Sequence, residues 1–388
     1  MKPLPYIRDW VPTAGFYFDR PLVLIQSDDW GRVGVRDREG MEELRAAGVV
    51  LGERAYDSYT LETADDLSVL KDVLNRHWDS DRNHPCIAMN FLLFNVDFEK
   101  TLSQGFSDIH LVQLAEGLPR PWRRPGLFEA YRAGVAEGVF QAALHGTTHF
   151  CRPAIERATV EGGDRVRLLK ILWEAGTPYI YWRMPWVGYE YWDPGKPEGD
   201  RFIPLNRQQE LIGEAVGAFA KFFSALPRSA CAPGYRANRD THRAWAEHGI
   251  RVAQNGPGSN FPPHFDNFGI LHLGRTVEFE PVTDPAFSVE ACIGRAERSF
   301  ELGLPAIVSV HSINFHSTVQ DFRSRTVSAL DEFLSALETR HPELLYVRDE
   351  DLWEAIQRGS YQRTDHRTEL NVRRKAFVKA WSARKSKS

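Results

Sequence analysis

The stretch PLVLIQSDDWG, residues 21–31, decides what fold to expect from the chain. Its first part, Pro21–Gln26, is a short apolar run bounded by turn-forming residues, which predicts a buried strand. Two aspartates, Asp28 and Asp29, follow where that strand would end. In β/α barrels the reactive side chains gather at the carboxyl ends of the strands. This stretch therefore predicts both an element of the fold and a place to look for chemistry.

On either side of this stretch, apolar runs alternate with amphipathic helical stretches. Further strands are predicted at 86–93, 139–144, 229–232, 250–254, 270–279, 306–310 and 344–347. Helices are predicted at 64–78, 127–136, 211–223, 242–248, 289–302 and 322–337, the first opened by Thr63 and Asp66 at capping-box spacing. Such alternation indicates parallel β/α architecture, and the number of units favours a barrel over an open sheet.

Composition narrows the class of protein. The chain has 388 residues, of which 43% are hydrophobic and 26% charged, so it can bury a large core and is not a disordered protein. No apolar run approaches the length that a bilayer requires. Residues 373–388 hold seven Lys/Arg and no acid, whereas residues 1–372 hold 41 Lys/Arg against 52 Asp/Glu. An acidic body argues against a nucleic-acid groove.

We therefore predict one barrel over residues 1–372 and a basic, peripheral tail over 373–388. A frayed, solvated end is favoured for the tail over contact with an anionic membrane surface. The four cysteines are widely spaced, which fits neither a disulfide scaffold nor a cysteine-rich zinc site. Residues 1–15 show no apolar leader, so a cytoplasmic location is expected.

One segment does not fit the alternation. Residues 179–193, YIYWRMPWVGYEYWD, are dense in aromatics and lead into a stretch rich in Pro and Gly, which predicts an insertion near 179–207. Its aromatic side chains could form a lid or stacking wall for a sugar ring. They could equally form a hydrophobic plug at one end of the barrel.

Polar residues at three predicted strand ends form a consistent set. Asp28 and Asp29 end the first strand, His145 and His149 end a middle strand, and His311 ends a late one. Two histidines and one carboxylate can hold a metal ion with open coordination positions. A second carboxylate can then take a proton from an attacking water, and a histidine can protonate a leaving group.

Each feature taken singly has an ordinary explanation. A lone H-x-x-x-H pair occurs by chance, Asp-Asp after a strand is commonly a helix cap or a solvated turn, and His311 could be a hydrogen-bonded core residue. The occurrence of all of them at strand ends is the more specific signal.

These motifs resemble those of the polysaccharide deacetylase family (carbohydrate esterase family 4), which includes nodulation, chitin and peptidoglycan deacetylases. The family's T-F-D-D motif is similar to residues 26–29, its H-[ST]-x-x-H motif to residues 145–149, and its late histidine to His311. The resemblance covers most of residues 22–356. It implies an α/β fold, namely a distorted (β/α)7 barrel.

The resemblance also implies roles for individual residues. Asp28 would be the general base and His311 the general acid. Asp29, His145 and His149 would hold a divalent metal ion, with Zn²⁺ the first choice. Metal-assisted hydrolysis of an N-acetylated amino sugar or a related small amide would follow.

The chain departs from the family pattern in the second, third and fourth motifs. Gly146 stands where the family usually has Ser or Thr. In the R-x-P-[FY] motif, alignment on Pro233 places Cys231 at the arginine and Gly234 at the aromatic residue. The fourth motif, with its aspartate and tryptophan, has no clear match near Asn255. The substrate-facing wall is thus expected to differ from that of the family.

Five residues are candidates for orienting the base or contacting substrate: Tyr235, Arg236, Arg183, Trp30 and Trp186. A backbone N–H near Tyr235 is a further candidate for stabilising the oxyanion. Because the expected arginine is missing, a non-catalytic glycan-binding barrel that keeps the metal site stays open. A non-haem iron oxygenase is the third alternative, disfavoured because its carboxylate usually follows the first histidine.

Overall fold

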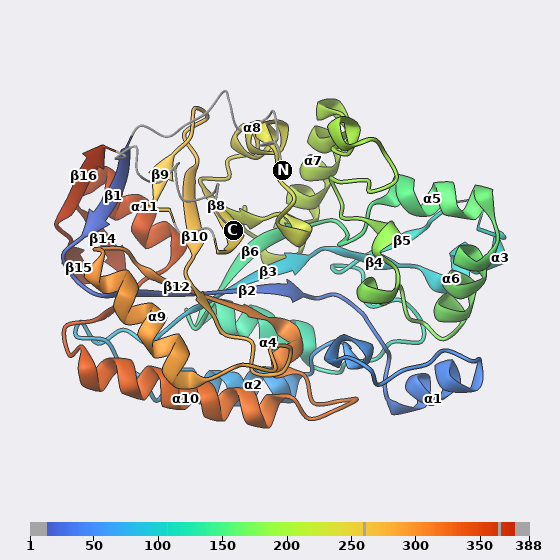
Figure 1. The fold of residues 1–388 in the computed structure, drawn as a ribbon, viewed down its shortest axis with the longest axis horizontal. Coiled ribbons are helices and arrows are strands. Elements are labelled where there is room, and N and C mark those ends of the chain that lie inside the picture. Colours follow the sequence, from blue (N-terminus) through green and yellow to red (C-terminus); the bar gives the residue numbers. More distant parts are fainter. Residues whose placement is uncertain (1–13, 107, 259–260, 364–365, 377–388) are drawn as a thin grey trace.

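The computed structural model describes residues 14–106, 108–258, 261–363 and 366–376. Parallel strands run through its centre and helices cover them on both sides (Figure 1). The strands of the central ladder are β2 (Leu22–Trp30), β3 (Ile87–Leu92), β6 (Phe140–Gly146), β7 (Ser229–Cys231), β8 (Val252–Pro257), β10 (Leu271–Arg275) and β12 (Ala306–His311). Every one of them lies at a predicted strand, so the predicted alternation is confirmed.

The ladder runs β12-β2-β3-β6-β7-β8-β10, and every pair in it is parallel. After β10, only Thr276 intervenes before β11 (Val277–Glu278), which pairs in parallel with β12. The amide of Thr276 donates to the carbonyl of Ile307 on β12 at 3.0 Å. The path of pairings therefore returns to β12, as a distorted (β/α)7 barrel requires.

Helices of the described residues connect and cover these strands. They are α1 (Arg38–Ala46), α2 (Ala64–Leu74), α3 (Phe98–Ser103), α4 (Leu127–Ala136), α5 (Arg152–Glu161), α6 (Asp164–Glu174), α7 (Leu205–Phe223), α8 (Arg239–Glu247), α9 (Val289–Glu301), α10 (Arg323–Arg340) and α11 (Asp349–Arg358). At the start of α2, Thr63 and Asp66 form the predicted capping box. No helix in the described parts of the chain is long and apolar enough to cross a membrane.

The interior of the barrel has an apolar layer and a polar layer. Strand residues two apart point to the same side, so Leu24, Val252, Leu273 and Ile307 form an apolar cluster with residues of α11. Two positions further along the same strands, polar side chains replace them: Gln26, Gln254, Arg275 and Ser309. The polar layer lies towards the carboxyl ends of the strands, and it positions the candidate site.

Small antiparallel pairings lie beside the barrel. They join β4 (Phe94–Val96) to β5 (Leu111–Gln113), β9 (His264–Phe265) to β10, β14 (Ser360–Arg363) to β15 (His366–Glu369), and β1 (Ala14–Phe18) to β16 (Val372–Ala376); β13 (Leu345–Tyr346) pairs in parallel with β2. The predicted basic tail begins within one of these pairings. Residues 373–376 are exposed but belong to β16, because their backbone groups pair with β1. Residues 377–388 lie outside the described residues.

The predicted aromatic insertion has irregular structure. It contains three short 3-10 helices, Tyr181–Arg183, Pro185–Val187 and Glu198–Asp200, and isolated bridges that join Trp192 to Tyr189 and Phe202. Helix α7 begins at Leu205, six residues before the predicted start at Leu211 and inside the predicted insertion. The reason is that Pro204 precedes the helix and fixes its first turn, a start signal that the apolar pattern alone does not contain.

Candidate active site and metal centre

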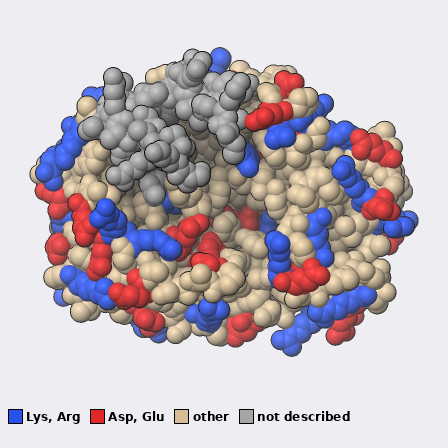
Figure 2. Space-filling view, in the orientation of Figure 1, with Lys and Arg blue, Asp and Glu red and all other residues tan. Residues whose placement is uncertain are grey.

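A cavity of about 530 Å³ opens at the carboxyl ends of β2, β6 and β12. Figure 2 shows a hollow near the centre of the molecule, surrounded mainly by uncharged surface with charged side chains at its edge. The polar groups that line the cavity include Asp28, Asp29, His145, His149 and His311. The structure therefore brings together all five residues that the sequence motifs singled out for chemistry.

Asp28 and Asp29 point in different directions because the strand is irregular there. The pairing of β2 with β3 shifts register between Ser27 and Trp30. Asp29 has a left-handed backbone (φ 75°), which costs a non-glycine residue about 1–3 kcal/mol. The result is that Asp28 faces Arg275 in the barrel interior, whereas Asp29 faces the two histidines.

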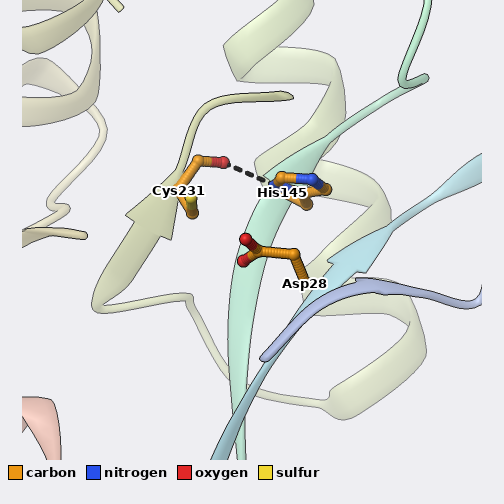
Figure 3. Close-up of side chains that lie close together, drawn as sticks. All are labelled: Asp28, His145 and Cys231. Carbon is orange, nitrogen blue, oxygen red and sulfur yellow. Dashed lines mark hydrogen bonds between the residues drawn. The ribbon is translucent and has the colours of Figure 1, made fainter. Parts of the chain in front are cut away.

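Asp29, His145 and His149 converge on one point. The Oδ1 atom of Asp29 lies 3.5 Å from Nε2 of His145 and 3.3 Å from Nε2 of His149. On the other side of its ring, Nδ1 of His145 lies 2.8 Å from the carbonyl oxygen of Cys231, the contact drawn in Figure 3. A carbonyl oxygen accepts only, so this contact places the proton on Nδ1 and leaves the Nε2 lone pair free towards Asp29.

The donor set fits a divalent cation such as zinc. Among the described residues, Asp29 Oδ1 is buried and has no hydrogen-bond partner, which is costly unless another group takes its lone pairs. Burial lowers the pKa of His149 to about 3, so its ring is neutral and can act as a ligand. Two imidazoles and one carboxylate whose ligand atoms lie within 4.8 Å of one another match an open zinc site.

A second grouping shares His145 but does not suit a metal. Asp28, His145 and Cys231 also lie close together, as Figure 3 shows. In that grouping the nearby nitrogen of His145 is the one bound to the Cys231 carbonyl, and Asp28 is paired with Arg275. Burial raises the pKa of the Cys231 thiol well above its usual value, so no thiolate is available.

Asp28 is held by a residue that the motif search did not find. Arg275 on β10 is fully buried and binds Asp28 through two hydrogen bonds, Nη1 to Oδ2 at 2.6 Å and Nη2 to Oδ1 at 2.7 Å. Burial opposes ionisation of Asp28, but the charge and hydrogen bonds of Arg275 hold its pKa well below the usual range. Asp28 is therefore ionised at every ordinary pH.

Arg275 fills the role expected of the third-motif arginine from a different strand. Cys231, which stands at the family's arginine position, lies beside it, with Sγ 3.7 Å from Nη2. The small thiol leaves room for the guanidinium group that comes from β10. The signal that could have revealed Arg275 was an arginine inside a predicted strand of the barrel, because buried arginines are paired.

A second carboxylate lies beneath Arg275. The Nε of Arg275 donates to Gln26 Oε1 at 3.2 Å, and the Nη2 of Arg275 donates to Gln254 Oε1 at 3.0 Å. The amides of the two glutamines each donate to Asp349 at 2.7 Å. Asp349 on α11 thus closes a buried hydrogen-bonded network that fixes the guanidinium from below.

His311 lies across the cavity from the metal triad. Its Nδ1 is 2.6 Å from Glu280 Oε1, and its Nε2 is 3.9 Å from Asp28 Oδ2. Burial alone would lower the pKa of His311, but the charge and hydrogen bond of Glu280, together with Asp28, raise it to about 9. His311 is therefore protonated at neutral pH and can donate a proton from Nε2.

The predicted substrate contacts have different fates. Tyr235 lines the cavity, and its hydroxyl donates to Asp28 Oδ2 at 2.9 Å. Arg183 instead pairs with Asp57 at 3.0 Å, and the guanidinium of Arg236 lies over the ring of Trp192. The guanidinium partner of Asp28 among the described residues is instead Arg275.

Two predicted tryptophans and one backbone group lie away from the cavity chemistry. Trp30 has no exposed surface and stacks on Phe315, so it belongs to the core. Trp186 packs against the core, with Arg165 over its ring. The backbone N–H of Tyr235 itself donates to the carbonyl of Ala232 at 2.8 Å, and an oxyanion contact from a backbone N–H near Tyr235 stays a prediction.

The insertion supplies much of the aromatic wall of the cavity. Tyr179, Tyr181, Trp182 and Tyr189 line it, together with Tyr56 and Tyr59 from the segment before α2. A lining role is therefore observed for Trp182, and it is the tyrosines, rather than the other tryptophans, that accompany it.

Comparisons with known proteins give distant structural likenesses. No protein-family model and no curated protein matches the sequence. Solved structures match over most of the chain. A Mycobacterium smegmatis protein assigned as a polysaccharide deacetylase has 11% identity and a TM-score of 0.48, over 90% of this chain and 95% of its own. One with the same assignment from Pseudomonas aeruginosa PAO1 has 13% identity and a TM-score of 0.44, over 88% and 92%. Puue allantoinase has 11% identity and a TM-score of 0.44, also over 88% and 92%. At these scores the likenesses say what the chain is similar to, and they carry no argument about its chemistry.

Proposed function

We propose that the protein is a metal-dependent hydrolase that removes an acyl group, in the first instance acetyl, from an N-acetylated amino sugar or a related amide. One observation carries the proposal. A single cavity contains a cation-ready triad with an unpartnered carboxylate oxygen, an ionised aspartate and a protonated histidine. Hydrolysis of an amide needs these three functions together.

Asp29, His145 and His149 would hold the cation. When bound there, a divalent cation supplies Lewis acidity, which polarises the acyl carbonyl and makes water easier to deprotonate. The neutral imidazoles and the free Oδ1 of Asp29 are the groups that this chain provides for it. Zinc is our first choice because its usual ligands are of these types.

Asp28 would accept the proton of the attacking water. Its four lone-pair positions receive Asn90 Nδ2, both terminal nitrogens of Arg275 and the hydroxyl of Tyr235. Of these donors, only Tyr235 lines the cavity. The water therefore reaches Asp28 at Oδ2, where the Tyr235 hydroxyl must turn aside or pass the proton on.

His311 would protonate the departing amine. Glu280 keeps its ring oriented and charged, and Nε2 faces the cavity close to Asp28. A proton accepted by Asp28 and one donated by His311 balance the hydrolysis of one amide bond. The two groups lie 3.9 Å apart, so both can reach atoms bonded to the same reacting carbon.

The aromatic walls support a sugar as the substrate. Seven tyrosine or tryptophan side chains line the cavity, and aromatic rings can stack on the apolar faces of a sugar ring. A non-catalytic glycan-binding barrel was an alternative mainly because the expected arginine was missing. Arg275 now occupies that role, which favours an active enzyme. The cytoplasmic location remains an expectation.

The test is acetate release from N-acetylglucosamine and its oligomers by the purified protein loaded with zinc. We expect release that stops with a chelator and returns when zinc is added back. Sugar binding without acetate release by the loaded protein would favour the glycan-binding alternative. Turnover that requires iron and oxygen would favour the oxygenase and overturn the hydrolase.

A further inference from the structure

Two residues of the insertion, Tyr189 and Glu190, contact two loops of the candidate site. We propose that this dipeptide is a positioning element of the metal centre, and that Glu190 fixes the loop between the two histidine ligands. The proposal rests on the proposed metal site. It adds a residue outside every motif that led to that site.

Glu190 binds the loop from His145 to His149 at its centre. Its Oε1 accepts the backbone N–H of Thr147 at 2.8 Å and that of Thr148 at 3.2 Å, and it also accepts the hydroxyl of Thr147. Converging backbone N–H groups form a small anion-binding concavity, which a carboxylate fills well. Since Glu190 is almost completely buried, little water competes for these bonds.

Gly146 provides the space for Glu190. A Cβ built on Gly146 would overlap the Glu190 carboxylate, and the glycine itself has a backbone that L-residues rarely adopt (φ 133°). The departure from Ser or Thr at this position is thereby explained. The loop lacks a side chain at residue 146 because a side chain from residue 190 occupies that place.

Tyr189 likewise occupies side-chain space beside a glycine of the R-x-P-[FY] motif, Gly234. A Cβ built on Gly234 would overlap the Tyr189 ring, so the ring lies where an aromatic side chain at 234 would begin. On its other side, the ring packs edge to face on His149, with ring centroids 5.4 Å apart. Tyr189 thus connects the loop that carries Tyr235 to a proposed metal ligand.

The dipeptide is itself held from both sides. Before it, the carbonyl of Val187 accepts the N–H of Cys151, next to the histidine loop. After it, Asp193 receives two hydrogen bonds of 2.7 Å from Arg157 on α5. A segment anchored in this way can hold its neighbours in place, which is what positioning of a ligand requires.

The first experiment measures zinc affinity by competition with a chromophoric chelator. Removal of partners that orient metal ligands typically weakens metal binding about 10- to 100-fold, so we expect that loss for Glu190→Ala. Glu190→Gln keeps an acceptor oxygen for the loop and should recover most of the affinity. Glu198→Ala, an exposed position of the same insertion, serves as the matched control and should bind zinc like the wild type.

The second experiment is a double-mutant cycle read by thermal unfolding without metal. Gly146→Ala should lower the melting temperature in the wild type, through both backbone strain and overlap with Glu190. In the Glu190→Ala background only the strain remains, so the same substitution should lower it less.

The outcomes separate this inference from the proposed function. If folded Glu190→Ala binds zinc as tightly as the wild type, or if the two substitutions are additive, the positioning role is wrong. If the wild type binds no zinc, the proposed metal centre fails and the positioning role fails with it. In that case the cycle still reports whether Glu190 and residue 146 compete for one space.

Discussion

Two clusters in this barrel combine a carboxylate with imidazoles, and the chemistry open to them differs. Asp29 lies with His145 and His149 at the mouth of the cavity, and Asp266 lies with His242 and His272 between α8 and β10. Both sets have ligand atoms within 4.8 Å of one another. By composition and distance alone they are equivalent metal sites.

The difference is in the lone pairs that remain. Asp266 Oδ1 accepts the backbone N–H groups of Phe268 and Ile270, and its Oδ2 lies 3.2 Å from Nε2 of His272. The second nitrogen of His272 faces the amide of Asn255 at 3.4 Å. Asp29 Oδ1, by contrast, has no partner among the described residues. A cluster whose groups satisfy one another stabilises the fold, whereas one with an unused buried oxygen is prepared for a ligand.

The largest expected effect is on metal content. His145→Ala should lose bound zinc and at least about 1,000-fold in acetate release, because the cation supplies several kcal/mol of transition-state stabilisation. His272→Ala should keep one zinc per chain and its activity. Elemental analysis of the two purified variants after dialysis measures this; loss of zinc from His272→Ala alone would reverse the assignment.

The second effect separates the proton acceptor from a structural carboxylate. Asp28→Asn removes a base without touching the triad, so activity should fall about 100- to 10,000-fold while zinc stays bound. Asp266→Asn keeps the shape of a residue that takes no part in the proposed steps, and this variant should stay within about threefold of wild-type kcat/KM. Equal activity losses in the two variants would remove Asp28 from the mechanism.

The third effect is on protonation. His311 faces Glu280 and Asp28, and its pKa is raised from 6.5 to about 9. Two imidazoles face Asp266 in the other cluster, and burial lowers the pKa of one of them, His242, to about 3. Because a general acid works only when protonated, kcat/KM should decline above a pH of about 9, or lower once a cation is bound nearby. Glu280→Gln removes the charge that raises this pKa and should shift the alkaline limb down by about 1–3 pH units.

A pH–rate profile of the wild type and of Glu280→Gln measures this shift. NMR titration of the ring protons measures the pKa of His242. An unchanged alkaline limb in Glu280→Gln would mean that His311 is not the acid.

The smallest effect is on stability without metal. His149 Nδ1 is buried without a partner among the described residues, so His149→Phe should leave the free energy of unfolding within about 1 kcal/mol of wild type or raise it. His272→Phe leaves an oxygen of Asp266 unsatisfied and should lower it by about 1–3 kcal/mol. Urea unfolding after chelation measures both values. A larger loss of unfolding free energy in His149→Phe would show that the cluster of Asp29, His145 and His149 also stabilises the fold.

Much of the barrel could be predicted from the sequence because its elements follow local patterns. Helix α4 has the predicted bounds, residues 127–136, and α2 has the predicted cap. Helices α1, α3, α5, α6 and α11 were missed. α5, for example, has alanines and arginines with little apolar contrast, so periodicity gives it no signal.

The residues of the candidate site also divide into those that the sequence pattern located and those that it did not. The five motif residues, Asp28, Asp29, His145, His149 and His311, lie at or just after the carboxyl ends of strands, so a motif locates them and the barrel brings them together. Arg275, Glu280 and Glu190 could not be assigned roles, because each acts through a partner more than 30 residues away in the chain. Only the tertiary fold makes those pairs neighbours.

The closing seam of the ring also orders events during synthesis of the chain. Every proposed cation donor lies within the first 149 residues, on β2, at the end of β6 and just after it. Arg275 and Glu280 flank the β10–β11 seam, and His311 ends the later strand β12. A growing chain therefore contains its cation donors and Asp28 well before the residue proposed as the acid. An incomplete barrel that lacks β12 would have the proposed ligands and base but no proposed acid.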